Sequence, residues 1–185
     1  MFKKLTLTLF LYLFTITLLL GQDTNPQTAD SILKASYKQA NASDKNVFLI
    51  FHASWCGWFK RLEKAMQSDE LKKIFEDNYV ITHLDVQDRG DKIKGLENLS
   101  GNEVMKNLGG EKSGLPFYAF LDAAGKKLAD SNVMPKNQNI GYPGSDEEID
   151  AFGKLLKTIA KNLSDEKFAT IIDYLKKNAP APVSH

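Results

Sequence analysis

The pattern of apolar and polar positions predicts a chain of alternating helices and strands. Apolar residues spaced three and four apart predict a first helix, and Asp30 is expected to cap it. Apolar runs predict strands over 47–51, 79–86 and 115–121, the first buried on both faces, and a returning strand after a turn at Gly125. Further helices are expected over 58–67, 69–77 and 103–108, from Ser145 onward, and from Ser164 or Asp165 onward.

This order of elements predicts the fold class. Strand–helix–strand units place two strands in parallel through a right-handed crossover. The strand pair around Gly125 predicts an antiparallel hairpin. We therefore expect an α/β protein with a mixed central sheet, helices on both faces and an extra C-terminal helix. The domain is expected over 30–178, with a flexible leader at 22–29 and a tail at 179–185.

The first 21 residues have the pattern of a secretory signal. A short basic stretch precedes an uncharged apolar run over 5–20, and Gly21 follows. The run is shorter than the roughly 20 apolar residues that a membrane span needs. We expect a signal peptide over 1–21, a periplasmic or secreted protein, and no membrane span after its removal. Leu19 stands where a small residue is preferred, so an uncleaved membrane anchor is the alternative.

Charge and cysteine content narrow the function classes. The chain has 24 basic and 23 acidic residues, a formal net charge of +1. This balance gives no support for nucleic-acid binding, which needs a surplus of Lys and Arg on one face. The single cysteine excludes an all-cysteine metal cluster, and the scattered His52, His83 and His185 argue against other metal sites. We expect no metal and no cofactor.

The only thiol, Cys56, lies between a predicted buried strand and a predicted helix. Amides at a helix N-terminus favour negative charge, and Lys60, Arg61 and Lys64 add positive charge nearby. Both effects favour the thiolate, which is the nucleophilic form. The flanking Trp and Gly residues indicate an exposed, reactive Cys56, and the alternative is a small buried hydrophobic residue. An exposed odd cysteine can also link two copies through a Cys56–Cys56 disulfide.

The surroundings of this thiol carry a resemblance to a known family. The motifs are Trp55-Cys56-Gly57-Trp58 after an apolar strand and Leu115-Pro116 before a later one. Together they resemble the thioredoxin superfamily, in particular exported thioredoxin-like proteins with a Trp-Cys-Gly-x-Cys-Lys motif, over about residues 30–161. The resemblance implies a thioredoxin-like three-layer fold, Cys56 as the catalytic thiol, and a cis Leu115–Pro116 bond against it. A substrate groove beside Leu115 and Pro116 would offer backbone pairing to an extended client.

The chain departs from this family at Phe59, where the family has its second cysteine. The family's buried acid would fall near Ile50, which is apolar. Without a second thiol, Cys56 cannot close an intramolecular disulfide. The remaining chemistry is attack on a disulfide, a mixed disulfide, and release by an outside thiol. Phe59 is bulky and apolar, and it either covers the sulfur or enlarges an apolar rim.

Two functions are compatible with these residues. The first is an exported thioredoxin-like protein, oxidoreductase-like with impaired turnover, limited to monothiol exchange at Cys56 with protein or small-molecule thiols and disulfides. The second is a redox-inactive module of the same fold that binds peptides or a partner protein. Trp55 and Trp58 either join the core or form an apolar rim at which a peptide docks.

His52 and His83 are both interpreted as structural and not as catalytic residues. His52 lies four residues before Cys56, a spacing that could suggest a base and its nucleophile. It stands at a strand end, however, where helical spacing does not apply, so a packing or rim role is favoured. His83 alternates with Leu84 and is interpreted as an ordinary strand residue.

Overall fold

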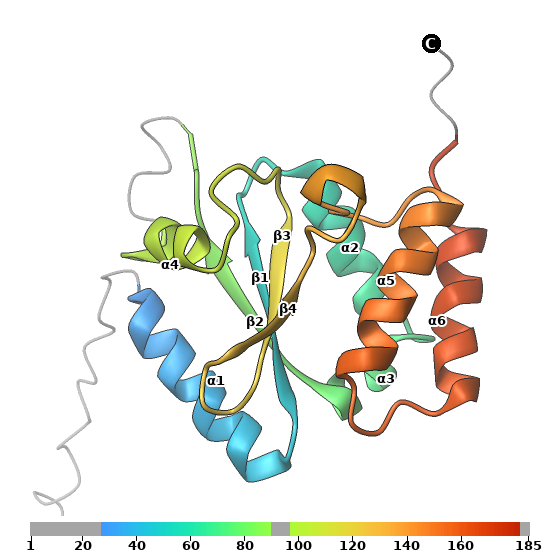
Figure 1. Ribbon diagram of the computed structural model, residues 1–185, viewed down its shortest axis with the longest axis horizontal. Helices are drawn as coiled ribbons and strands as arrows, with labels where there is room; N and C mark the ends of the chain where they lie inside the picture. Colours follow the sequence, from blue (N-terminus) through green and yellow to red (C-terminus); the bar gives the residue numbers. More distant parts are fainter. Residues whose placement is uncertain (1–26, 90–96, 182–185) are drawn as a thin grey trace, which may run out of the picture.

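The computed structural model describes residues 27–89 and 97–181 (Figure 1). The predicted signal peptide over 1–21, the alternative anchor, the first part of the leader and the last four residues of the tail lie outside the described residues. Among the described residues, no helix has the length and apolar character needed to cross a membrane.

A four-stranded mixed sheet forms the centre of the fold (Figure 1). Its order is β2-β1-β3-β4, with β1 parallel to β2 and β3 antiparallel to both β1 and β4. The strands are β1 (Asn46–His52), β2 (Tyr79–Asp85), β3 (Phe117–Leu121) and β4 (Lys127–Asp130). The predicted mixed sheet, with a parallel pair and a later hairpin, is confirmed.

The apolar run of β1 accounts for its central place. Every residue of β1 except His52 is buried. Side chains alternate between the faces of a strand, so Phe48 and Ile50 join one apolar cluster while Leu49 and Phe51 join the other. A strand buried on both faces needs cover on both sides, and the sequence supplies it with two sets of helices.

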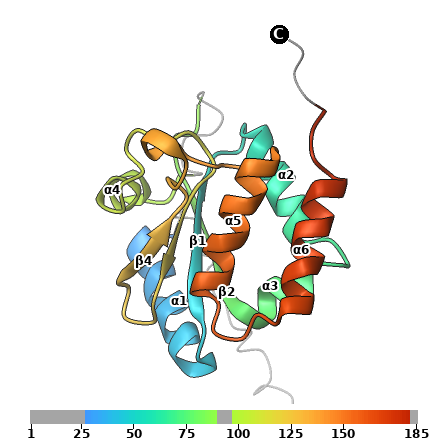
Figure 2. The ribbon, with the colours of Figure 1, turned by 45° about the vertical axis from the view of Figure 1, so that its right-hand side comes forward.

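The helices lie in two layers, one on each face of the sheet (Figures 1 and 2). One face is covered by α1 (Ala29–Ser43) and α4 (Gly101–Asn107). The other is covered by α2 (Gly57–Met66), α3 (Lys72–Asn78), α5 (Asp146–Ile159) and α6 (Asp165–Lys177). The α6 helix packs beside α5 and is the extra C-terminal helix that the sequence predicts.

The helix starts show which capping predictions hold. The capping box before α5 is confirmed, because Ser145 Oγ accepts from the Glu148 amide and Glu148 Oε2 accepts from the Ser145 amide. The predicted cap of α1 is wrong. Thr28 caps this helix instead, and Asp30 lies in the first turn, 2.7 Å from Lys34 Nζ. Asp and Thr both cap helices well. Ala29 is fully buried as the first residue of the helix, so the capping position falls on Thr28, the residue before it.

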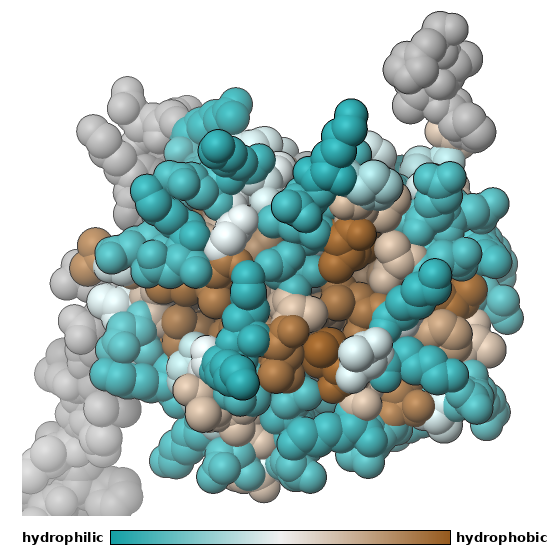
Figure 3. Space-filling model, in the orientation of Figure 1, coloured by the Kyte–Doolittle hydropathy of each residue, from teal (hydrophilic) through white to brown (hydrophobic). Residues whose placement is uncertain are grey.

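The sheet edge at β4 carries a patch of apolar surface. A β-bulge interrupts the pairing of β4 with β3 between Phe120 and Leu121. Leu128 and Val133 are exposed and line a shallow hollow between β4 and α5, where apolar side chains gather on the face shown in Figure 3. Bulges at edge strands discourage further strand pairing, so we regard this edge as protected.

Candidate functional site

The thiol of Cys56 caps the N-terminus of α2. The backbone of Cys56 is extended (φ −75°, ψ 105°), and its sulfur accepts a hydrogen bond from the Phe59 amide at 3.4 Å. The thiol also donates to the carbonyl oxygen of Leu115, 3.3 Å away. The sulfur is therefore held between the first turn of a helix and the loop before β3. Its position at the helix start is the one that the sequence predicts.

The expectation of an exposed thiol is wrong. Only 3% of Cys56 is accessible to solvent, and the residue belongs to the larger of the two apolar clusters. The contact with the Leu115 carbonyl brings the loop before β3 against the sulfur. The sequence shows that Cys56 lies between a strand and a helix, but the covering loop comes from 59 residues further along the chain.

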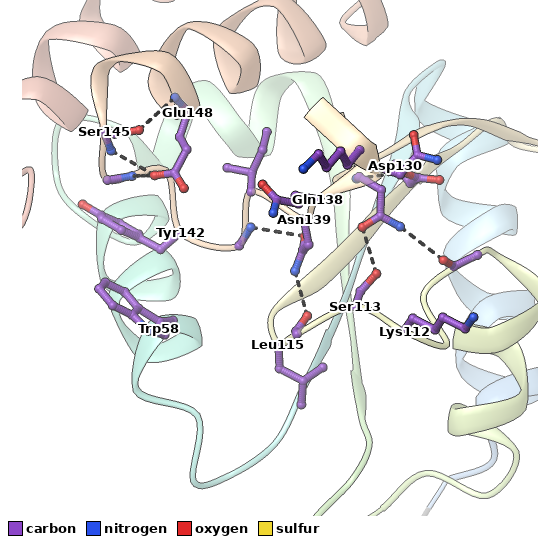
Figure 4. A pocket seen from close by; sticks show the side chains of 18 of the residues that line it. Trp58, Lys112, Ser113, Leu115, Asp130, Gln138, Asn139, Tyr142, Ser145 and Glu148 are labelled. Atoms are coloured by element: carbon purple, nitrogen blue, oxygen red, sulfur yellow. Dashed lines mark hydrogen bonds between the residues drawn. The ribbon is translucent and has the colours of Figure 1, made fainter. Parts of the chain in front are cut away.

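The loop that contacts the thiol has a defined geometry. The Leu115–Pro116 peptide bond is cis, the isomer that the family resemblance implies. Asn139 ties this loop to the following one (Figure 4): its Nδ2 donates to the carbonyls of Gly114 and Pro116 at 2.7 and 3.0 Å. Its Oδ1 accepts from the Gly141 amide at 3.2 Å. The Asn139 carboxamide therefore fixes the position of the loop that contacts the Cys56 sulfur.

The two tryptophans lie at the surface on either side of Cys56. Trp55 is 42% exposed, its Nε1 donates to the Gln87 carbonyl at 2.9 Å, and Arg89 lies over its ring at 4.3 Å. Trp58 is 51% exposed and stacks on Tyr142 with 6.2 Å between ring centroids, as Figure 4 shows. These exposures favour the docking rim over the alternative that both rings belong to the core.

Phe59 points into the protein instead of adding to that rim. It is 6% exposed, and its ring stacks face to face on His52 with 3.8 Å between centroids and 6° between planes. The ring of His83 meets it edge-on at 5.6 Å. The expectation that Phe59 could enlarge the rim is therefore wrong. A residue three after the N-cap of α2 faces the sheet, and a large apolar side chain fills the space there.

His52 has the packing role that the sequence favours, although its environment is polar as well. Its Nδ1 lies 3.3 Å from Asp85 Oδ1, in an approach that lacks hydrogen-bond geometry. Burial lowers the pKa of His52, and the negative charges of Glu63 and Asp88 oppose this effect. The imidazole is therefore held in its neutral form against Phe59.

His83 differs from the ordinary strand residue expected from the sequence. Its Nε2 is buried and has no hydrogen-bond partner among the described residues. Burial lowers the pKa of His83, and the nearby His52 lowers it further. The parallel register pairs Ile50 with His83 and His52 with Asp85, so both imidazoles project from one face of neighbouring strands. The sequence predicts a parallel pair of strands but not its register, and this register brings the centroids of the two imidazole rings to 5.5 Å.

Two further positioning residues were not identified from the sequence. Asp88 Oδ1 accepts hydrogen bonds from the Ser54 amide at 2.8 Å and the Ser54 hydroxyl at 2.7 Å, and so fixes the loop before Cys56. Asn139 does the same for the loop before β3. Both lie in segments rich in turn-forming residues, where many side chains have the same capacity. At Gly57 a Cβ would meet nothing within 4 Å, so the space around this position does not require a glycine.

Within 27–89 and 97–181, no group of three or more His, Cys, Asp or Glu side chains is arranged to hold a metal ion.

Comparisons with known proteins place the chain in a family. Solved structures that it resembles include a disulphide isomerase from Xylella fastidiosa Temecula1, with 17% identity, coverage of 80% of this chain and 89% of that one, and a TM-score of 0.48. Another is an oxidoreductase named DsbH, with 22% identity, coverage of 73% and 84%, and a TM-score of 0.42. The search of curated proteins found no match. A family model described as thioredoxin-like matches residues 28–123, more than half of the chain, and the chain therefore belongs to the thioredoxin-like family.

Proposed function

We propose that this protein exchanges disulfides through Cys56 alone, as an exported monothiol member of its family. Membership of the thioredoxin-like family supports a thiol–disulfide function in general. The observation that carries the proposal is the position of the sulfur, at the start of α2 and 3.3 Å from the Leu115 carbonyl. In that position the amides of a helix N-terminus stabilise negative charge on an attacking sulfur.

The reaction needs one thiol from the protein and one from outside. The Cys56 thiolate attacks a disulfide of the client. A bond forms between the two sulfurs, the client's S–S bond breaks, and the second client sulfur leaves as a thiolate. An external thiolate then attacks the client sulfur of the mixed disulfide, a bond forms between these two sulfurs, and Cys56 leaves as a thiolate. A second external thiol reduces the new disulfide between the client and the first external thiol, which completes the reduction of the client. The external thiol supplies the reducing equivalents, because Phe59 stands where a second cysteine would supply them.

Burial of the sulfur sets a condition on this reaction. With 3% of Cys56 exposed, a disulfide reaches the sulfur only when the loop around Leu115 moves aside. The exposed Trp55 and Trp58 provide a surface on which a client binds first. Docking and opening therefore precede the chemical step.

A mass measurement tests the proposal. The folded protein is incubated with a peptide disulfide, the adduct is followed by intact mass, and a small monothiol is then added. We expect one adduct on Cys56 that the monothiol releases. Cys56→Ser is the control and forms none. Absence of an adduct on the folded chain, with full reaction of the urea-unfolded chain, would contradict the proposal.

The burial of Cys56 favours a second candidate function, a redox-inactive module that binds peptides or a partner protein. In that case Cys56→Ser leaves partner binding unchanged and the folded thiol stays unreactive. The Trp55 and Trp58 side chains would still be required, because they present the exposed aromatic surface.

Export is part of the proposal and has its own test. N-terminal sequencing of the protein purified from cells should find Gln22 as the first residue. Retention of residues 1–21 together with the membrane fraction would instead support the uncleaved anchor.

A further inference from the structure

A large hollow lies between Trp58 in the first turn of α2, the loop before β3 and the loop before α5 (Figure 4). It has a volume of about 1260 Å³, more than the roughly 300–1,000 Å³ of a typical small-molecule site. Trp58 and Tyr142 lie at one end and Lys112 and Ser113 at the other, with Leu115 and Asn139 between them. Its size and its opening beside Leu115 suit a stretch of polypeptide.

The carboxylates that line this hollow are already engaged. Glu111 pairs with Lys106 at 2.8 Å, and Asp130 pairs with Lys127 at 2.8 Å. Glu148 Oε2 accepts from the amides that precede α5, each at 2.9 Å, in the capping arrangement drawn in Figure 4. These acids are therefore poorly placed to attract a cation from a ligand.

Three cations around the hollow form no ion pair among the described residues, although the charge of Lys112 also acts on the neighbouring Glu111. Lys112 and Lys136 line the hollow and form neither an ion pair nor a side-chain hydrogen bond there. Arg61 lies over the rings of Trp58 and Tyr142, 5.6 Å from each centroid. The lining residues carry equal numbers of positive and negative formal charges. The carboxylates are engaged within the protein, however, so the lysines that form no ion pair are the charges that a ligand can contact.

The loop that carries Lys136 is held in a defined shape. Lys136 and Asn137 both adopt left-handed backbone conformations (φ 61° and 57°), which are uncommon outside glycine. An isolated bridge between Met134 and Gln138 closes this turn, and Asn139 anchors it to the loop before β3. The fixed turn holds the backbone of Lys136 beside the hollow, and its exposed ammonium group is within reach of a ligand there.

From this geometry we infer that the hollow binds an extended, acidic segment of a client polypeptide, with Lys112 and Lys136 as its charge partners. The inference rests on the proposed function, because it assigns the hollow as the place where the client of Cys56 binds. Opposite charges at an exposed rim contribute modestly to affinity and more to selectivity and association rate. The effect should weaken at high salt, because exposed charges are screened.

Binding of labelled peptides to the Cys56→Ser chain tests this inference without using the thiol. Two peptides of equal length differ only in acidic or basic residues flanking a central serine. We expect the acidic peptide to bind about fivefold tighter at low salt, with most of the difference lost at high salt. The variant K112E/K136E should reverse the preference.

The matched control is K38E/K126E, which changes the net charge equally at exposed lysines that do not line the hollow. It should leave the preference unchanged. Equal affinity for both peptides, no binding of either, or the same effect from the control pair would overturn the inference. Competition by a small dicarboxylate as effective as that by the peptide would overturn its polypeptide part. A chain that forms the mixed disulfide but fails these binding tests would separate this inference from the proposed function.

Discussion

Replacing Phe59 by cysteine measures what the departure from the family motif contributes to the fold. The ring of Phe59 is 6% exposed and lies flat against His52 at 3.8 Å, with His83 edge-on at 5.6 Å. Truncation of a buried Phe to Ala costs about 3–5 kcal/mol through lost burial and the cavity left behind. Sulfur refills part of the space, so we expect Phe59→Cys to lower the free energy of unfolding by about 2–4 kcal/mol.

The assay is urea unfolding under reducing conditions, where no disulfide between Cys56 and the introduced thiol contributes. The neighbouring substitution Trp58→Cys is the matched control. Trp58 is 51% exposed and stacks on Tyr142, and loss of such an aromatic pair costs about 0.5–1.5 kcal/mol, less than the loss expected at Phe59. Equal losses in the two variants would refute the packing assigned to Phe59. Under oxidising conditions, Phe59→Cys should also form an internal disulfide that the natural chain cannot form.

Three further predictions concern stability around the site. Tyr118→Phe should raise the free energy of unfolding by about 1 kcal/mol, because the buried Tyr118 hydroxyl has no hydrogen-bond partner among the described residues. Tyr79→Phe should lower the free energy of unfolding by a similar amount, because the Tyr79 hydroxyl donates to the Leu156 carbonyl at 2.9 Å. Urea unfolding of the two variants checks the opposite signs. Asn139→Ala should lower the free energy of unfolding by about 1–3 kcal/mol and speed adduct formation at the thiol, because the loop that covers the sulfur loses its anchor. Asn139→Asp keeps the acceptor but loses the donors and should behave alike. Thermal unfolding and adduct rates measure both effects. Because the pKa values of His52 and His83 are lowered in the fold, the unfolded chain binds more protons below about pH 6.5, so stability should fall between neutral pH and about pH 5.5. Unfolding curves across that range should show a shallower fall for His83→Gln, and an unchanged slope would contradict the assigned burial.

Local sequence patterns predicted most of the helices and strands. The apolar run over 47–51 predicted a strand buried on both faces, because no other element of that length hides five consecutive large side chains. The Ser145 and Glu148 pair predicted the start of α5 for a similarly local reason. Both features depend on neighbours in sequence, and the structure confirms both.

Features that depend on distant contacts were harder to predict. The solvent exposure of Cys56 is decided by Leu115, and the surroundings of Phe59 are decided by the register between β1 and β2. The family resemblance placed Leu115 and Pro116 against the thiol, but neither it nor the residues next to Cys56 and Phe59 indicated how fully these two side chains are buried. The sequence therefore placed Cys56 at the start of a helix, but it did not point to Asp88 or Asn139, and the burial of the thiol required the tertiary structure.

The enclosure of the Cys56 sulfur bears on self-association. Two chains joined by this residue would need their sulfurs about 2.05 Å apart, with the surrounding Cβ atoms about 3.5–4.5 Å apart. Cys56 is 3% exposed and its sulfur contacts the Leu115 carbonyl, so we expect that two folded copies do not bring their sulfurs to that distance. Purified protein kept in air should consequently remain free of covalently linked pairs, and any that accumulate would report how often the cover opens.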